Sequence, residues 1–333
     1  MSKKKFITIG FFALILVAVA CFETKSPSEP EIEKPPVTTT TAEVFGTFRI
    51  QLIPEVVDPI EPSNNTRAFT NFIGKMKDGP SCPTEFYKET MVTGQSKLFK
   101  TDQPFCSEKC QSGYKCVGND SCMRDPKTLS VGNITLTGMK SGGEPITVVS
   151  EAFSPKYDYM IVSPYPDYPP AAEGDTITMS AAGSGSVDPF TIKLRCIAPL
   201  VVLNGEIVLD GKDVTLEWEP PKVEGVSTIS IRFNLSYHGV IKGEIKCETE
   251  DDGSVTIPGK MLDELKSYGT AGYPAVYLTR QSVVVDEATK VKATVECTIT
   301  KLLTIPGEIS CSGDGTGDGV CPEGKQCIDR KCQ

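Results

Sequence analysis

Apolar and polar residues alternate along six separate stretches of this chain, and no other feature restricts its fold as strongly. In residues 229–237, Ile229, Ile231 and Phe233 alternate with polar neighbours, and five further stretches repeat the pattern: residues 48–52, 190–196, 214–218, 241–247 and 291–299. Because successive side chains of a strand point to opposite faces, each stretch predicts a strand with one apolar face. Helical spacing is clear only over residues 258–267, which predicts one short helix ending near Gly269.

Many short strands separated by glycine, proline, aspartate and asparagine turns are typical of β-sandwiches. The 333 residues are enough for about two domains. We therefore predict an all-β protein of two sandwiches, over residues 44–198 and 199–305. Residues 213–220, DVTLEWEP, resemble the second strand of fibronectin type III-like domains, so the resemblance implies an immunoglobulin-like second sandwich with Trp218 in its core rather than on a ligand platform. The alternation slips at Gly132, within a strand predicted over residues 129–139, as a β-bulge would allow.

The first twenty residues have the order of an export signal. Lys3, Lys4 and Lys5 precede residues 6–20, which are uncharged and too short to span a bilayer. Cys21 follows directly, and small residues leading into a cysteine resemble the bacterial lipobox, although Ala18 stands where leucine is usual. The resemblance implies that Cys21 carries a lipid anchor. An ordinary secretion signal and an uncleaved anchor are the alternatives.

Residues 21–43 contain four prolines, a threonine run and almost no large apolar residue, which predicts a disordered tether. Phe22 rather than aspartate follows the cysteine, and by the enteric sorting rule this implies the outer membrane. We expect a lipid-anchored protein of the cell envelope, in an oxidising compartment where disulfides persist.

A cysteine motif occurs twice. Cys110 and Cys116 flank Gly113 in the pattern C-x2-G-x2-C, as Cys321 and Cys327 flank Gly324, and each copy has one more cysteine before it and one after it. Zinc and disulfides are both possible readings; without C-x2-C pairs or histidine we favour disulfides. The chain has 13 cysteines, so setting Cys21 aside leaves an even number for pairing. We predict small disulfide modules at residues 105–123, as an insert, and 306–333.

Four cysteines allow three pairings in each module. Small cysteine-rich repeats, which both modules resemble, imply pairing of the first with the third and the second with the fourth. Outside the modules, Cys196, Cys247 and Cys297 are in phase with inward residues, and we predict that two of them pair while the third reaches Cys82. The twelve cysteines assigned to six disulfides are Cys82, Cys106, Cys110, Cys116, Cys122, Cys196, Cys247, Cys297, Cys311, Cys321, Cys327 and Cys332.

Larger segments resemble a family. Residues 105–139, with SVGNITLTG at 130–138, residues 251–258, DDGSVTIP, and residues 311–332 are similar to uncharacterised cysteine-rich lipoproteins of myxobacteria and related deltaproteobacteria. The resemblance extends over most of the chain beyond residue 43. It supports fold and location, and it implies no activity.

Composition excludes several functions. The formal net charge of −9 argues against nucleic-acid binding, and His238, the single histidine, cannot build a multi-histidine metal site. Asp314 and Asp318 are weak calcium candidates, because two acids in a glycine-rich loop offer too few oxygens. The acidic run at residues 248–252 predicts a solvated turn. Tyr157, Tyr159, Tyr165 and Tyr168 predict a loop packed on a sandwich, with sugar or partner binding as the alternative.

We expect a non-enzymatic, membrane-anchored lipoprotein that exposes β-sandwiches for binding, structural or adhesive interactions, without a cofactor or a metal. The membrane, through the lipid on Cys21, and an envelope protein or polysaccharide are the expected partners. The alternative is an exported carbohydrate-binding protein or a hydrolase accessory that uses paired carboxylates.

Overall fold

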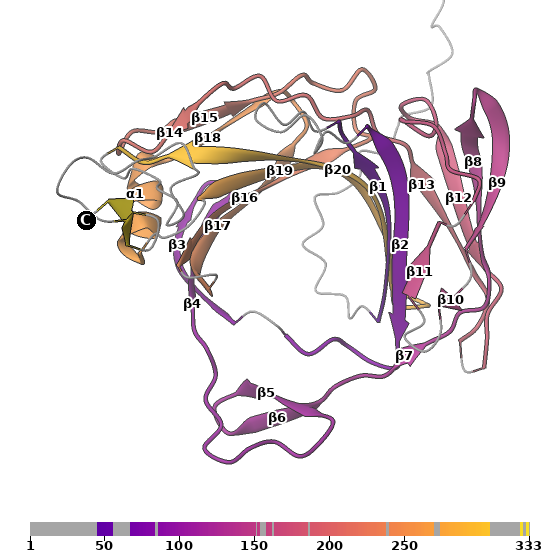
Figure 1. The fold of residues 1–333 in the computed structure, drawn as a ribbon, viewed down its shortest axis with the longest axis horizontal. Helices are drawn as coiled ribbons and strands as arrows, with labels where there is room; N and C mark the ends of the chain where they lie inside the picture. The colour runs from indigo at the N-terminus through magenta and orange to yellow at the C-terminus, as the bar shows by residue number, and fades with distance from the viewer. Residues whose placement is uncertain are drawn as a thin grey trace, which may run out of the picture. The chain divides into compact units, whose positions relative to one another are not determined.

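The fold is all-β with one short helix, as predicted (Figure 1). The structure is a computed structural model, and it describes residues 45–55, 67–83, 86–150, 152–153, 158–161, 163–185, 187–237, 240–269, 274–306, 327–328 and 331–332. The predicted signal peptide (1–20), Cys21, the predicted tether and His238 lie outside the described residues. In the part of the chain that is described, no helix has the length and apolar character needed to cross a bilayer.

One sheet carries most of the strands. Its hydrogen-bonded order is β10-β11-β2-β1-β20-β19-β16-β17-β4-β3, with β7 paired to β2 and β14 paired to β20. These strands are β1 (Gly46–Ile53), β2 (Phe69–Lys77), β3 (Tyr87–Thr93), β4 (Ser96–Thr101), β7 (Thr128–Leu129), β10 (Ala152–Phe153), β11 (Asp158–Met160), β14 (Ile207–Val208), β16 (Thr228–Tyr237), β17 (Val240–Glu250), β19 (Ala275–Asp286) and β20 (Val291–Thr304).

A second sheet covers the end of the first sheet that contains β1 and β2. It has the order β13-β12-β8-β9, formed by β8 (Ile134–Ser141), β9 (Glu144–Ser150), β12 (Thr176–Ala181) and β13 (Phe190–Arg195). The Phe48 ring of β1 lies between the layers, with its centroid 6.0 Å from the Phe190 ring and 5.9 Å from the Tyr159 ring. Apolar residues of both sheets, which the alternation places inward, thus form one buried core.

The bulge lies elsewhere than predicted. Gly132 has a φ of +70° but precedes β8, and the register shift falls between Leu136 and Met139. Gly138, with a φ of +86°, occupies this shift, and a Cβ there would overlap the Thr176 carbonyl oxygen. Glycine is needed at the bulge because another residue would be strained and would collide with the neighbouring strand.

The C-terminal half has the strand pairing of an immunoglobulin-type sandwich. The pair β15 (Val214–Glu217) and β18 (Ser254–Ile257) forms one layer, and the other layer is the run β17-β16-β19-β20 of the large sheet. Helix α1 (Gly259–Ser267) joins β18 to β19 and ends near Gly269, as predicted. It buries Met261, Leu262 and Leu265. Trp218 is 1% exposed, so it is a core residue.

The boundary placed between residues 198 and 199 does not separate two sheets. Strand β1 pairs in parallel with β20, and β4 pairs with β17, so N-terminal strands extend both sides of the C-terminal run. An uncovered edge strand presents unpaired N–H and C=O groups, and here β1 and β4 satisfy these groups on β20 and β17. The two sandwiches therefore share one sheet. Alternation predicts which residues face inward but carries no information on which strand is the neighbour.

Candidate functional site

The first cysteine module folds as a small hairpin with two disulfides. Strands β5 (Tyr114–Gly118) and β6 (Ser121–Arg124) pair in antiparallel fashion around Asp120, whose φ is +53°. The disulfides join Cys106 to Cys116 and Cys110 to Cys122, which confirms the predicted alternating pairing in this module. Cross-links of this kind replace the apolar core that so short a segment cannot build.

Asp78 fastens the module to the end of β2. Its carboxylate accepts hydrogen bonds from the Arg124 guanidinium at 2.9 Å and from the Lys127 backbone N–H at 2.7 Å. The Arg124 hydrogen bond is the main reason that the pKa of Asp78 lies below its usual value. The Cys82 thiol also faces the Arg124 carbonyl at 3.4 Å. The module is thus held to the large sheet at a defined position.

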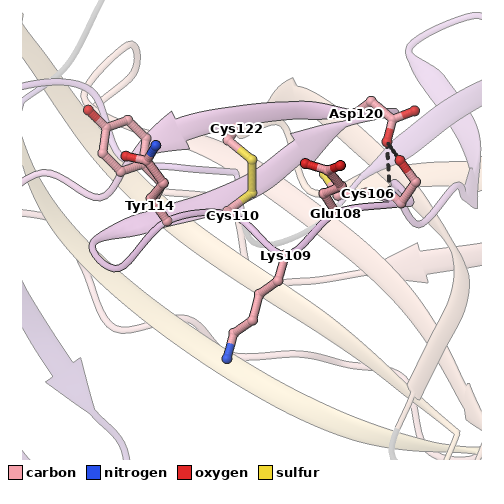
Figure 2. A pocket seen from close by; sticks show the side chains of 9 residues that line it. Cys106, Glu108, Lys109, Cys110, Tyr114, Asp120 and Cys122 are labelled. Carbon is pink, nitrogen blue, oxygen red and sulfur yellow. Dashed lines mark hydrogen bonds between the residues drawn. A yellow bond between two sulfur atoms is a disulfide. The ribbon is translucent and has the colours of Figure 1, made fainter.

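A pocket of about 530 Å³ opens on the module (Figure 2). Figure 2 shows Tyr114 toward one end and Asp120 toward the other, with the Cys110–Cys122 disulfide between them. The Asp120 carboxylate accepts hydrogen bonds from the Ser107 N–H at 2.7 Å and the Ser107 hydroxyl at 2.6 Å, and these bonds lower its pKa. Glu108, Lys109 and Gln111 complete the polar lining.

Two aromatic side chains of the module are exposed. Phe105 is 71% exposed, although phenylalanine is among the residue types most often buried, and Tyr114 is 43% exposed. Tyr114 lines the pocket. The module therefore combines a cross-linked backbone with exposed aromatic and polar groups.

Four cysteines predicted to form disulfides are free and buried: Cys82, Cys196, Cys247 and Cys297. Cys247 and Cys297 lie on β17 and β20, with β19 and β16 between them. Three strand spacings of about 4.8 Å each separate the Cα atoms of these two residues by far more than the roughly 7 Å that a disulfide can bridge. The Cys196 thiol contacts the Ala171 carbonyl at 3.5 Å, and Cys82 faces the module's backbone. The alternation therefore predicts correctly that Cys196, Cys247 and Cys297 are buried, but it does not predict which cysteines lie close enough to pair.

The predicted C-terminal module, residues 306–333, lies almost entirely outside the described residues. Beyond residue 306, only β21 (Cys327–Ile328) and β22 (Lys331–Cys332) are described, and in this antiparallel pair Cys327 lies opposite Cys332. The cysteines Cys311 and Cys321 and the calcium candidates Asp314 and Asp318 fall outside the described ranges. Their disulfide and metal assignments stay predictions.

Metal-ligand types come together in one place among the described residues. The sulfur atoms of Cys106, Cys110 and Cys122 all lie within 4.8 Å of one another. All three are joined in disulfides, so in this oxidised state none offers a thiolate to a metal.

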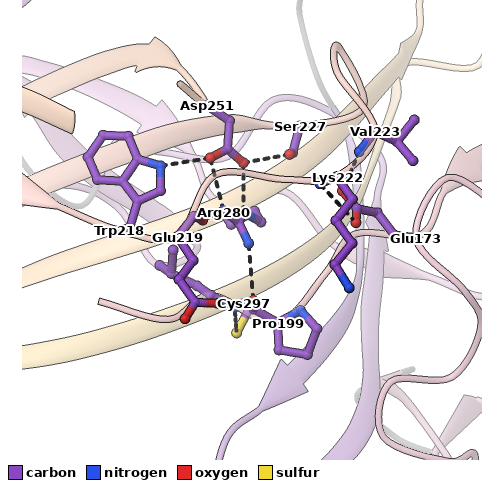
Figure 3. A network of polar contacts seen from close by, with 11 residues as sticks. Glu173, Pro199, Trp218, Glu219, Lys222, Val223, Ser227, Asp251, Arg280 and Cys297 are labelled. Carbon is purple, nitrogen blue, oxygen red and sulfur yellow. Dashed lines mark hydrogen bonds and ion pairs between the residues drawn. The ribbon is translucent and has the colours of Figure 1, made fainter. Parts of the chain in front are cut away.

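The acidic run at residues 248–252 is not wholly a solvated turn. Asp251 is buried in a network of polar contacts, shown in Figure 3, and its carboxylate accepts from the Arg280 guanidinium at 2.6 and 3.0 Å. Trp218 Nε1 at 2.8 Å and the Ser227 hydroxyl at 2.6 Å are its other donors. Arg280 also donates to the backbone carbonyls of residues 199 and 219. The network therefore fastens the start of the C-terminal sandwich.

A second buried carboxylate, Glu244, lies on the opposite face of the sheet. It is 0% exposed and forms ion pairs with Arg232, at 2.8 Å, and with Lys246. Along β17, Glu244 alternates with the inward residues and therefore points to the outer face of the sheet. Asp251 lies on the inner face, where it bonds to Arg280. These two carboxylates therefore cannot flank one glycosidic bond as a hydrolase requires.

The tyrosine-rich segment is only partly a loop, because Tyr159 lies on β11, which pairs with β2; Tyr159 and Tyr168 both pack inward. Tyr159 is 1% exposed, and its hydroxyl accepts from the Val131 N–H at 2.7 Å and donates to the Gly132 carbonyl at 3.0 Å. Tyr168 packs against the core, and burial raises its pKa. Tyr165 is 65% exposed, and Tyr157 lies outside the described residues.

Sequence reasoning missed the pocket, because nothing in the cysteine spacing shows which side chains surround a cavity. No protein-family model matches this chain, and a search of curated proteins also found no match.

Proposed function

We propose that this chain is a non-enzymatic lipoprotein of the cell envelope, anchored through Cys21, that binds an envelope component through its disulfide module. The proposal rests chiefly on the module itself. It is cross-linked twice, fastened to the large sheet through Asp78, and exposes Phe105 and Tyr114. A rigid support that presents exposed aromatic groups favours binding, because little conformational freedom is lost when the partner docks.

The anchor and the tether supply the other half of the argument. A lipid on Cys21 would hold the protein at the membrane, and the tether at residues 21–43 would let the folded part reach a partner at a distance from the surface. The buried carboxylates Asp251 and Glu244 are engaged in ion pairs, as structural groups are. These features favour a binding role over the hydrolase alternative.

Membrane attachment is tested by Cys21→Ser. We expect this variant to leave the detergent phase and to appear as unprocessed precursor or as soluble protein. A variant that still fractionates with the membrane would contradict the anchor.

Binding is tested by capture from solubilised envelope, with the full-length mature chain carrying Cys21→Ser as bait. We expect it to retain an envelope component, and we expect Phe105→Ala/Tyr114→Ala to lose it. The matched control is Tyr165→Ala, which removes an aromatic side chain outside the module whose exposure of 65% lies between those of Tyr114 and Phe105. Equal capture by all three proteins, or capture by none, would contradict a binding role for the module.

A further inference from the structure

The backbone that surrounds the module pocket is held by cross-links. Both disulfides adjoin it, because Cys106, Cys110 and Cys122 are among its lining residues. The Asp120–Ser107 hydrogen bonds close one end. Its volume of about 530 Å³ lies within the range of roughly 300–1,000 Å³ that is usual for small-molecule sites.

Its lining excludes a purely apolar ligand. Beside Tyr114 and the disulfide-bonded Cys106, Cys110 and Cys122, the lining side chains carry hydroxyl, carboxyl, ammonium and amide groups, and none of them is aliphatic. A lipid or an aliphatic side chain would bury these polar groups without hydrogen bonds, which is unfavourable.

Its charge does not favour a strongly ionic ligand either. Glu108 and Lys109 carry opposite charges on adjacent residues, and the Asp120 carboxylate already accepts two hydrogen bonds from Ser107. A phosphate or another multiply charged group would therefore find little net attraction.

An uncharged polyhydroxylated ring matches what remains. Its hydroxyls both donate and accept hydrogen bonds, as the Gln111 amide and the Glu108 carboxylate of the lining require between them. Its C–H face can pack on the Tyr114 ring, which is 43% exposed and offers an apolar body with a polar tip. We infer that the pocket binds a neutral sugar unit of an envelope polysaccharide, with Tyr114 as the stacking platform. This inference rests on the proposed function and names its ligand class.

The test measures binding of immobilised neutral di- to tetrasaccharides of hexoses and N-acetylhexosamines to the oxidised mature chain carrying Cys21→Ser. We expect binding by at least one of them, a loss of at least about tenfold in affinity for Tyr114→Ala, and near-normal affinity for Tyr114→Phe, which keeps the ring. Gln111→Ala should weaken binding by about three- to tenfold through a lost hydrogen bond. Affinity should change less than about twofold between low and high salt, because the ligand is uncharged.

Tyr165→Ala is the matched control, and mass spectrometry of each variant verifies that both module disulfides are present. Unchanged affinity in Tyr114→Ala, or equal losses in Tyr114→Ala and Tyr165→Ala, would overturn the assignment to this pocket. If no neutral saccharide binds below about 10 mM while module-dependent capture of an envelope component persists, the ligand class is wrong and the proposed function stands. If both assays are negative, both proposals fail.

Discussion

Removal of the Asp251 carboxylate should destabilise the protein severely. Asp251 and Arg280 have side chains that are each 2% exposed, so Asp251→Ala leaves a guanidinium buried without its counter-charge. Breaking a buried pair in this way costs about 3–5 kcal/mol. The Trp218 and Ser227 donors also lose their acceptor, at about 1 kcal/mol or more each, although local relaxation and water entry offset part of this. We expect a loss of about 4–5 kcal/mol, a large part of the stability of a typical domain.

The chain contains a single tryptophan, and it belongs to this network. Urea unfolding followed by Trp218 fluorescence therefore reports directly on the region that is perturbed. The matched control is Asp158→Ala, which breaks the exposed Lys75–Asp158 ion pair of 2.7 Å and should cost less than about 1 kcal/mol.

A double variant separates charge burial from simple loss of hydrogen bonds. Arg280→Met added to Asp251→Ala removes the uncompensated charge, so the double variant should be more stable than the sum of the two single losses predicts, by about 2 kcal/mol or more. Additive losses would refute the argument that an unpaired charge dominates. A cost below about 1 kcal/mol for Asp251→Ala alone would refute it as well.

Three further outcomes follow from particular contacts. Burial raises the pKa of the Cys196 thiol to about 11 and also raises the pKa of Cys247 and Cys297. Alkylation of the native protein at pH 8 should therefore spare these three thiols, and denaturation without reductant should expose them. Rapid labelling of the native protein would contradict this. Arg124 holds the pKa of Asp78 below its usual value, so the stabilisation from Asp78 is complete above about pH 5 and is lost progressively as the pH falls through the lowered pKa. Amide exchange in β5 and β6 should then accelerate in the native protein, and Asp78→Asn should not show this step. Gly74→Ala should lower the free energy of unfolding by about 1–3 kcal/mol, because its Cβ would overlap the Phe48 ring. Gly79→Ala, which has open space around its Cβ, should be close to neutral. Equal melting temperatures of the two variants would contradict the packing.

Local patterns in the sequence predict the local features of this fold. Alternation places Ile229, Ile231 and Phe233 inward, and all three are 0% exposed. The spacing of Met261, Leu262 and Leu265 predicts the buried face of α1. These properties depend on neighbours in the chain, so a single sequence is sufficient to find them.

Properties that depend on neighbours in space escape the same reasoning. Cys247 and Cys297 share an inward phase, yet the sheet order places two strands between them. The acidic run at residues 248–252 does not distinguish Asp251 from its exposed neighbours. The alternation does, because Asp251 continues the inward phase of Cys247 and Thr249, both of which are buried. A charge at an inward position calls for a buried partner, and Arg280 at an inward position of β19 supplies it.

The path of the chain into and out of the module connects it to distant parts of one sheet. The chain enters the module after β4, which pairs with β17, and leaves it into β7, which pairs with β2 (Figure 1). In the sheet order, β1, β20, β19, β16 and β17 lie between β2 and β4. The layer of the C-terminal sandwich that belongs to the large sheet therefore lies between the two attachment points of a module inserted in the N-terminal half. Shifts of β2 relative to β4 would strain a segment that two disulfides and the Asp78 hydrogen bonds already restrict. Attachment to two separate strands, together with these cross-links, therefore favours a single position of the module on the sheet, as the proposed binding role would require.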